Sequence, residues 1–329
     1  MASMIYSALV GIRQEILNEI YMLDEGKTPV MAALPAGPKP LDMLFSWVGE
    51  KIGNVISTGT LENTAATNPA RQDRKLIEGY CQLFRQEWGV GTIAKAVVTA
   101  GVKDEAAKQM LAAMIRHRIM VEQQFLSADD CSAESGETPF TTRGMFSWTS
   151  PDEQSTKPLD STLRPASATR HAAALSGLTE DAFIALLAAA YAEKNAPLDL
   201  DGYVGATLKN VLDKFTVLGA AGDVPKVAYN VMGADEYVRK VEFLTTSYGD
   251  VRLHLSAYLA RTTSSGAATN YTTRSGVFID LSQWNVGWIE KPANTNLAAD
   301  GSGKKGFIDA IAGLRCLIAQ GQASVYASS

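Results

Sequence analysis

The chain has 329 residues, of which 46% are hydrophobic and 20% charged, an ordinary balance for a soluble globular protein. Its formal net charge of -5 argues against a general affinity for nucleic acid or for anionic lipid, because there is no basic surplus. No run of apolar residues approaches the roughly 20 needed to span a bilayer, so we expect no membrane partner. The length allows two domains, or one core that carries long excursions.

An amphipathic helix is predicted near the N-terminus. Its apolar stripe is formed by Leu9, Ile12, Ile16, Ile20 and Leu23, which recur at three- and four-residue steps. No basic residue precedes this stretch and no cleavage-type site follows it, so we interpret it as a mature intracellular start rather than a signal peptide. The stripe has no local partner, and it must dock on the chain's own core or on a neighbouring subunit.

A long projecting hairpin is predicted for residues 41–90. Prolines in the preceding segment impose an extended course. An outgoing strand carries Trp47, a polar tract forms the tip, and a strand-like stretch returns with Tyr80, Phe84 and Trp88. Basic and aromatic residues interleave in the returning stretch, as in a nucleic-acid stacking platform. Its glutamates and the acidic total charge favour packing against a protein partner instead.

The strongest helix signal covers residues 103–127. Asp104 is a plausible N-cap, and Glu105 lies in the first turn, where the helix dipole favours negative charge. The predicted buried stripe comprises Ala107, Met110, Leu111, Met114, Ile115, Val121 and Phe125. At ~1.5 Å per residue the helix would be on the order of 35–38 Å long, enough to form the backbone of a domain. A second capped helix is predicted to begin after Thr179.

The remaining segments favour an α+β fold. Residues 127–175 form a polar interval of low order around an isolated apolar cluster at 144–148. From residue 203 onward, short apolar runs alternate with turns. One strand with a single buried face is predicted from the alternation of Val251, Leu253, Leu255, Ala257 and Leu259. A few helices combined with many short strands argue against a regular βαβ succession.

A search for catalytic and metal-binding motifs finds none. His117, His171 and His254 are far apart and lack metal-ligand spacing. We expect His117 on a solvated or interface face of its helix and His254 on the exposed face of its strand. The three cysteines are widely separated, which indicates isolated structural thiols rather than disulfides. We predict no catalytic residue, no cofactor and no metal.

Two further patterns are candidates for an acid–base or phosphate-binding site. The carboxylate pairs Asp129/Asp130 and Asp199/Asp201 are expected in loops, where nothing marks them as tuned for acid–base work. Residues 300–306 combine glycine with lysine but fail the spacing of a phosphate-binding loop, so we interpret them as a hairpin tip.

The order of the segments is more informative than any single motif. In sequence they are Thr28-Pro29, Phe45-Ser46-Trp47, Tyr80-Cys81-Gln82-Leu83-Phe84, a long helix with Arg116, Arg118 and Glu122, Gly144-Met145-Phe146-Ser147-Trp148, the helix capped by Thr179, Tyr248-Gly249-Asp250-Val251 and Phe278-Ile279-Asp280. In this order, over residues 25–325, the chain resembles the major capsid proteins of tailed bacteriophages, which have the Hong Kong 97 capsid fold.

The resemblance implies a domain plan and a set of partners. It divides the chain into an N-terminal arm (1–40), an extended E-loop (41–90), a P-domain (91–175 and 276–329) with a spine helix (103–127), and an A-domain (176–275). It implies hexamers and pentamers of this chain that form an icosahedral virion shell around double-stranded DNA, without sequence-specific DNA binding. Portal, scaffolding and decoration proteins are further partners of such a shell, which is assembled in the bacterial cytoplasm.

The residues expected at subunit interfaces follow from the predicted arm and hairpin. They are Leu9, Ile12, Ile16, Ile20, Trp47, Tyr80, Phe84 and Trp88. Two alternatives stay open: an encapsulin-like compartment shell with the same fold, and an α+β enzyme with a loop-built active site. The enzyme would require a pocket that brings one of the three histidines to a carboxylate.

Overall fold

The fold mixes helices and strands, as the α+β prediction requires. The computed structural model describes residues 27–51, 62–63, 74–96, 104–215, 241–259, 261–262, 268–269, 273–298 and 303–326. The predicted N-terminal helix and most of the predicted hairpin tip lie outside the described residues. The helices are α1 (Pro29–Ala33), α2 (Thr92–Ala96), α3 (Glu105–Phe125), α4 (Met145–Trp148), α5 (Glu180–Lys194) and α6 (Ala206–Leu212).

The strands form two larger sheets and two small ones. They are β1 (Leu44–Glu50), β2 (Arg74–Tyr80), β3 (Gln82–Val90), β4 (Arg170–His171), β5 (Leu198–Val204), β6 (Phe243–Thr246), β7 (Gly249–Leu255), β8 (Arg261–Thr262), β9 (Ala268–Thr269), β10 (Gly276–Ile279), β11 (Trp284–Asn296), β12 (Lys304–Cys316) and β13 (Ala323–Val325). The larger sheets have the orders β4-β13-β10-β5-β7-β6 and β11-β12-β3, and β1 pairs only with β2.

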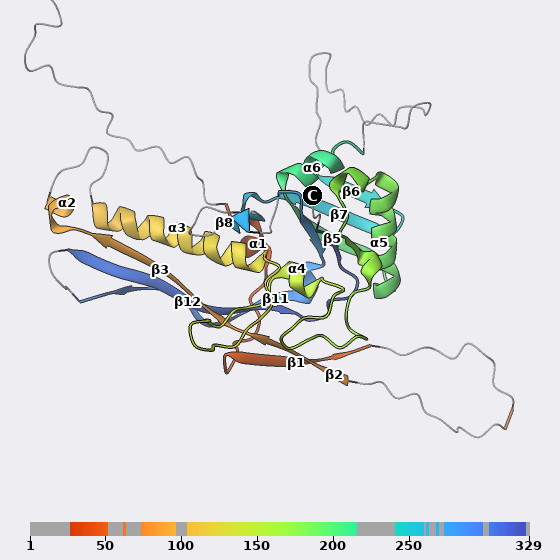
Figure 1. Ribbon diagram of the computed structural model, residues 1–329, viewed down its shortest axis with the longest axis horizontal. Coiled ribbons are helices and arrows are strands. Elements are labelled where there is room, and N and C mark those ends of the chain that lie inside the picture. The colour runs from red at the N-terminus through yellow and green to blue at the C-terminus, as the bar shows by residue number, and fades with distance from the viewer. Residues whose placement is uncertain are drawn as a thin grey trace, which may run out of the picture.

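The predicted hairpin is confirmed in the antiparallel pair β1–β2, which runs along the lower edge of the molecule (Figure 1). The returning stretch is not one strand, as expected, but two. At Cys81 the backbone N–H donates to the carbonyl oxygen of Met43 at 2.8 Å, and the chain then leaves β1. From Gln82 onward it pairs with β12 in the three-stranded sheet. A single residue therefore separates two strands that belong to different sheets.

The long helix α3 lies across the sheet β11-β12-β3 (Figure 1). Asp104 caps it as predicted, because its carboxylate accepts hydrogen bonds from the N–H groups of Ala106 and Ala107. The C-terminal half packs on the sheet through Phe125, whose ring meets that of Phe84 edge to face at 6.3 Å.

The first half of the predicted buried stripe of α3 is wrong. Leu111 and Met114 are 56% and 41% exposed, whereas Ala106, Ala113 and His117 are buried. Small side chains at the contact let the helix axis approach the sheet closely, so the alanine face turns inward and the larger apolar side chains face outward.

The strands β11 and β12 form a long antiparallel hairpin. The predicted hairpin tip at 300–306 is described only from residue 303 onward, and there residues 304–306 already belong to β12 and pair with β3. The pairing shifts register between Trp288 and Ala293. Pro292, which lacks a donor N–H, lies in this stretch of an edge strand, where such irregularities are tolerated.

The six-stranded sheet is covered on one face by α5 and α6 (Figure 1). Thr179 caps α5 as predicted, accepting from the Ala182 N–H at 3.2 Å. Phe183, Leu187, Leu200 and Phe278 contribute to the core beneath these helices. The opposite face carries Tyr203, Val277 and Ile279, which join the core of the three-stranded sheet and α4.

The strand predicted over residues 251–259 ends earlier than expected. Regular pairing of β7 stops at Leu255, whose side chain is 59% exposed, and Ala257–Leu259 forms a 3-10 turn. Val251 and Leu253 are buried as predicted. Period-two alternation continues in the sequence, but β5, the strand that β7 pairs with, ends at Val204 opposite Leu255.

Candidate functional site

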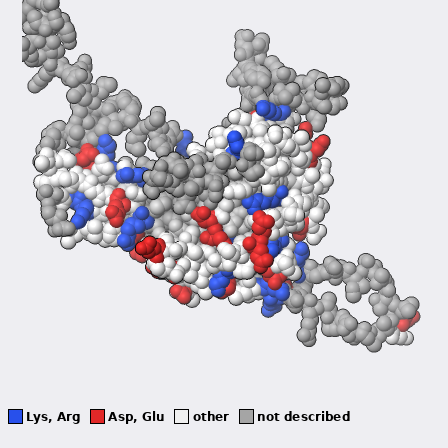
Figure 2. Space-filling model, viewed as in Figure 1, with Lys and Arg blue, Asp and Glu red and all other residues white. Residues whose placement is uncertain are grey.

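The described residues hold no cluster of three or more histidine, cysteine or acidic side chains that could bind a metal ion. In the same part of the chain, no helix is long and apolar enough to cross a membrane. All three cysteines are free and buried, as isolated structural thiols should be. Figure 2 shows acidic and basic side chains interspersed over the visible face, without a broad field of one sign.

The histidines lie in three separate places. His117 is buried between α3 and β3, with its Nε2 atom 3.3 Å from the Phe84 carbonyl oxygen, which contradicts the expected solvated face. Burial lowers its pKa, since the charged ring would lose its hydration there. His171 lies on β4, near the carbonyl oxygen of Ala174. His254 is on the exposed face of β7, as predicted, with its side chain 44% exposed.

The carboxylate pair Asp199/Asp201 lies on strand β5 and not in a loop as expected. Arg252 of the neighbouring strand β7 binds Asp199 at 2.6 Å and Asp201 at 3.4 Å. His254 adds a contact of 3.1 Å to Asp201. These side-chain contacts connect the parallel strands β5 and β7 at the surface of the sheet. Two hollows of about 650 and 450 Å³ in the described part of the chain have no histidine in their linings.

The other pair, Asp129/Asp130, belongs to the polar interval, which is more ordered than predicted. Arg143 is fully buried and binds Asp130 at 2.9 Å through Nε. It also donates to the carbonyl oxygens of Thr156 and Lys157, and its guanidinium group lies 4.5 Å from the Trp148 ring centroid. One buried side chain thus holds two turns of the interval against α4, a long-range arrangement that composition does not reveal.

The N-terminal lead-in to the body is anchored on α3 by a buried carboxylate. Pro29 opens the short helix α1, where a missing N–H is harmless. The next two backbone N–H groups, of Val30 and Met31, donate to the two carboxylate oxygens of Glu122 at 3.0 and 2.7 Å. Arg118, one turn earlier on α3, donates to the hydroxyl of Thr28 at 2.9 Å.

Glu122 is completely buried, and this burial raises the pKa of its carboxyl group to about 7. The two backbone donors and Arg118 oppose the shift but do not overcome the loss of hydration. The carboxyl group of Glu122 therefore fixes the start of α1 on α3.

The inner face of the β1–β2 hairpin is held by aromatic contacts. The Trp47 indole N–H donates to the Leu317 carbonyl oxygen at 3.2 Å, and its ring lies 5.7 Å from those of both Phe45 and Trp148. Phe45 lies directly over Gly313 of β12, where a Cβ atom would come within 2.4 Å of the ring. Glycine is therefore required there for the hairpin to seat on the sheet.

The outer face of the hairpin carries an exposed apolar pair. Val48 and Leu76 are directly paired across the two strands and are 59% and 57% exposed. The next pair toward the tip is Glu50 and Arg74, which form an ion pair of 3.1 Å. An exposed apolar pair at the centre of a thin two-stranded element is suited to contact with another molecule.

The residues predicted at interfaces lie in different environments in the structure. Leu9, Ile12, Ile16 and Ile20 lie outside the described residues. Trp47 is half-buried and faces inward, and Tyr80 is half-buried against the Phe140 ring at 5.7 Å. Phe84 and Trp88 are buried in the chain's own core, so the prediction that they face a neighbour is corrected. The reason is the change of sheet at Cys81, which moves both out of the hairpin.

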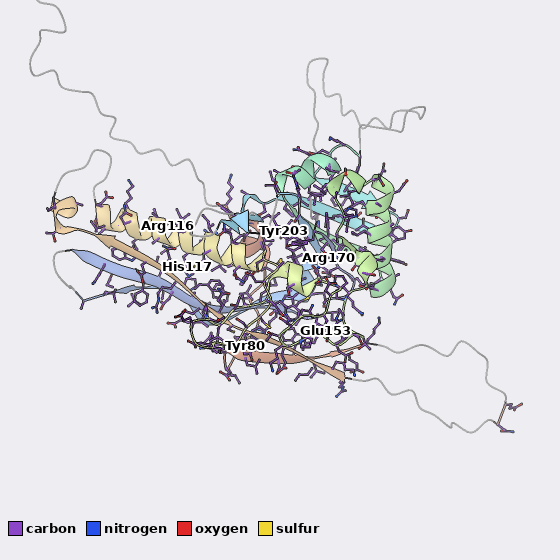
Figure 3. The ribbon with its side chains drawn as sticks, in the orientation of Figure 1. Tyr80, Arg116, His117, Glu153, Arg170 and Tyr203 are labelled. Atoms are coloured by element: carbon purple, nitrogen blue, oxygen red, sulfur yellow. The ribbon has the colours of Figure 1, made fainter. Side chains whose placement is uncertain are left out.

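Figure 3 shows how the labelled side chains are distributed over the body. Arg116 and His117 are adjacent on α3, but His117 points toward β3 and Arg116 away from it. Tyr80 lies at the lower edge, whereas Tyr203 and Arg170 lie on the side of the six-stranded sheet. The labelled side chains come from several elements and do not converge on one point.

Solved structures with the same overall architecture are phage capsid proteins. The capsid structure of cyanophage P-SCSP1u matches with a TM-score of 0.63 at 11% identity, over 97% of this chain and 94% of that chain. The Mycobacterium phage Bobi structure gives 0.60 at 11% identity, with 100% of both chains covered. The capsid of the native GTA particle gives 0.61 at 11% identity, with 98% of both covered. The fold is therefore that of a capsid subunit, of Hong Kong 97 type.

The family follows from a sequence comparison. The family model described as SU10 major capsid protein matches residues 4–325, nearly the whole chain. A search of the curated proteins found no significant match. The chain belongs to the SU10 major capsid protein family, and it is a structural component of a tailed-phage virion that associates with itself to form a capsid. Family membership confirms the prediction that it is not an enzyme and favours a phage capsid over an encapsulin-like compartment.

Proposed function

We propose that this major capsid protein forms hexameric and pentameric capsomers in which the outer face of the β1–β2 hairpin lies on a neighbouring subunit. The observation that carries this proposal is the exposed pair Val48 and Leu76 on a strand pair bonded to neither larger sheet. Within the described chain the inner face of the hairpin is anchored through Trp47, so the outer face is the side available to a partner.

Leaving the exposed Val48–Leu76 pair in water is unfavourable in free energy. Burial of apolar surface is worth roughly 25 cal/mol per Å², so two large aliphatic side chains covered in every subunit contribute to association. The Glu50–Arg74 ion pair lies on the same face and limits the ways in which a partner can be placed. Because the same contact recurs in every subunit of a closed ring, its small contributions to the free energy of association add up.

The domain plan supports the same assignment. Residues 1–40 would be the N-terminal arm, 41–90 the E-loop, 91–175 with 276–329 the P-domain, and 176–275 the A-domain. The shell would enclose double-stranded DNA without sequence-specific contacts and would be assembled in the bacterial cytoplasm. Portal, scaffolding and decoration proteins are the additional partners that this role would involve.

The test is a pair of matched double variants examined by negative-stain electron microscopy. V48D/L76D places two like charges in the proposed contact and should reduce the yield of rings and shells at least roughly tenfold, since a buried unpaired charge is costly. V48I/L76M keeps the surface apolar and should assemble like the wild type. Both positions are exposed but directly paired, so V48D/L76D should lower the free energy of unfolding of the isolated subunit by about 1–2 kcal/mol, whereas V48I/L76M should leave it nearly unchanged. Particle yield is therefore compared per folded subunit.

Particles of V48D/L76D at wild-type yield per folded subunit would contradict the proposed use of this face. A wild-type protein that stays monomeric under all assembly conditions would contradict the proposed capsomers themselves.

A further inference from the structure

The outward side of the long helix α3 carries an apolar stripe with no covering element in the described part of the chain. The stripe is formed by Ala107, Leu111 and Met114 at four- and three-residue steps, Arg118 bounds it one step further on, and all four residues are exposed. Leu111 and Met114, at 56% and 41% exposure, are among the most exposed large apolar side chains of the protein. At ~1.5 Å per residue the stripe is roughly 16 Å long.

Within the span of this stripe, the charged residues of α3 are all basic. Between residues 107 and 118 the charged side chains are Lys108, Arg116 and Arg118, all basic. His117 lies in the same stretch but points into the body toward Phe84. A partner for this face should therefore be a helix with an apolar stripe and acidic flanks.

The first described residues of the chain lie at one end of this stripe. Thr28 is bound by Arg118, and the start of α1 is fixed by Glu122, so residue 27 lies at the Arg118 end of the stripe. Any segment that directly precedes residue 27 must begin its course beside this face.

The preceding segment has the chemistry that the stripe requires. Its predicted helix carries the apolar positions Leu9, Ile12, Ile16, Ile20 and Leu23. Glu15, Glu19, Asp24 and Glu25 outnumber Arg13, so the segment is acidic where α3 is basic. A helix over 9–23 would be roughly 22 Å long, sufficient to cover the stripe from Arg118 back to Ala107.

We propose that residues 9–23 dock as a helix on the Ala107–Leu111–Met114–Arg118 stripe of their own chain in the unassembled subunit. The short connection to the anchored α1 gives this segment an effective concentration on the order of millimolar, far above that of a second copy in dilute solution. The contact covers both apolar stripes, and with parallel helices Leu23 lies near Arg118 and Ile16 near Leu111. The proposal uses the capsid role only to define the unassembled state.

The test is site-directed disulfide formation in the full-length subunit, purified as its smallest species. I16C/L111C should cross-link at least roughly tenfold more than the control pair I16C/A192C, because Ala192 is on the exposed side of α5, away from the stripe. The three native cysteines are buried free thiols, so they should give little background. In a mixture of isotopically heavy and light subunits, a contact within one chain joins only peptides of equal label.

A second measurement reports on the charges. R116E should reduce the cross-link of I16C/L111C several-fold, and added E19K should restore it, since the compensating change re-creates opposite signs. Circular dichroism spectra should show that each variant is folded. Mixed-label cross-links would show that a neighbour's segment occupies the stripe, which would overturn the proposal.

Cross-linking equal to that of the control pair, in folded subunits, would also overturn it. Neither result bears on the hairpin contact, whose test is particle formation by V48D/L76D. The two proposals can therefore fail independently.

Discussion

The six-stranded sheet and the β1–β2 hairpin bury their surfaces in opposite ways. The sheet is covered by α5 and α6 on one face and meets the three-stranded sheet region through Tyr203 and Ile279 on the other. The hairpin has one covered face, held by Trp47, and one exposed face with Val48 and Leu76. The burial of the two regions differs accordingly: the sheet core stabilises the subunit, and under the proposed function the exposed face of the hairpin contacts a neighbour.

The largest effect should follow from damage to the sheet core. F278A removes a fully buried ring that contacts Phe183 at 5.2 Å, and it should lower the free energy of unfolding by about 3–5 kcal/mol. The matched control F243A removes a ring that is 51% exposed in the same sheet and should cost less than about 1 kcal/mol. Denaturant unfolding of the isolated subunit measures both. Equal losses of stability for the two variants would contradict the interpretation that the buried core of the six-stranded sheet stabilises the subunit.

An intermediate effect is expected at the seat of the hairpin. W47A removes the ring between Phe45 and Trp148 together with its hydrogen bond to Leu317, and it should cost about 2–3 kcal/mol because the side chain is only half-buried. W47F keeps a ring and loses the donor, so it should cost about 1 kcal/mol. Per folded subunit, W47A should reduce particle yield more than F278A does, because it loosens the hairpin that carries the proposed contact. Normal assembly by W47A would show that the seat does not position the outer face.

The smallest effect concerns pH and Glu122. The pKa of this carboxyl is raised from 4.5 to about 7 in the folded chain, so the folded state holds the proton more tightly than the unfolded state. Its contribution to stability is therefore complete below pH 4.5 and is lost as the pH rises through 7. Between pH 5 and 7 the free energy of unfolding should fall by roughly 1–2 kcal/mol on account of this group.

E122Q, which cannot ionise, should flatten this part of the stability profile, whereas E105Q, at the half-buried first position of α3, should leave it as in the wild type. Urea unfolding at a series of pH values provides the measurement. An unchanged slope in E122Q would show that the carboxyl does not titrate there.

Features that depend on neighbouring residues were predictable from the sequence. The caps Asp104 and Thr179 bind backbone N–H groups two or three residues ahead, so their residue type and position suffice to place the starts of α3 and α5. The hairpin could be expected for a similar reason, since two apolar runs flank one polar tract. The whole-chain plan became predictable only through the order of these local signals.

Features that depend on distant contacts were not predictable. Glu122 has the appearance of a solvated helix residue, and its two donors are 91 and 92 positions away in the chain. Leu111 and Met114 fit a buried stripe equally well by periodicity, but Ala106 and Ala113 form the face that the sheet accepts. Val48 and Leu76 carried a usable signal, because they alternate with the inward-facing Trp47 and Ile77, yet only the pairing register shows that they meet.

The joint at Cys81 gives the hairpin a mechanical role. The strand β2 ends at Tyr80 and β3 begins at Gln82, so one residue connects the exposed hairpin to the strand beneath α3. Because no linker separates them, a displacement of the hairpin would be transmitted directly to β3, which pairs with β12 and packs against α3. Under the proposed function, strain at a subunit contact on the hairpin would reach the centre of the body by this route.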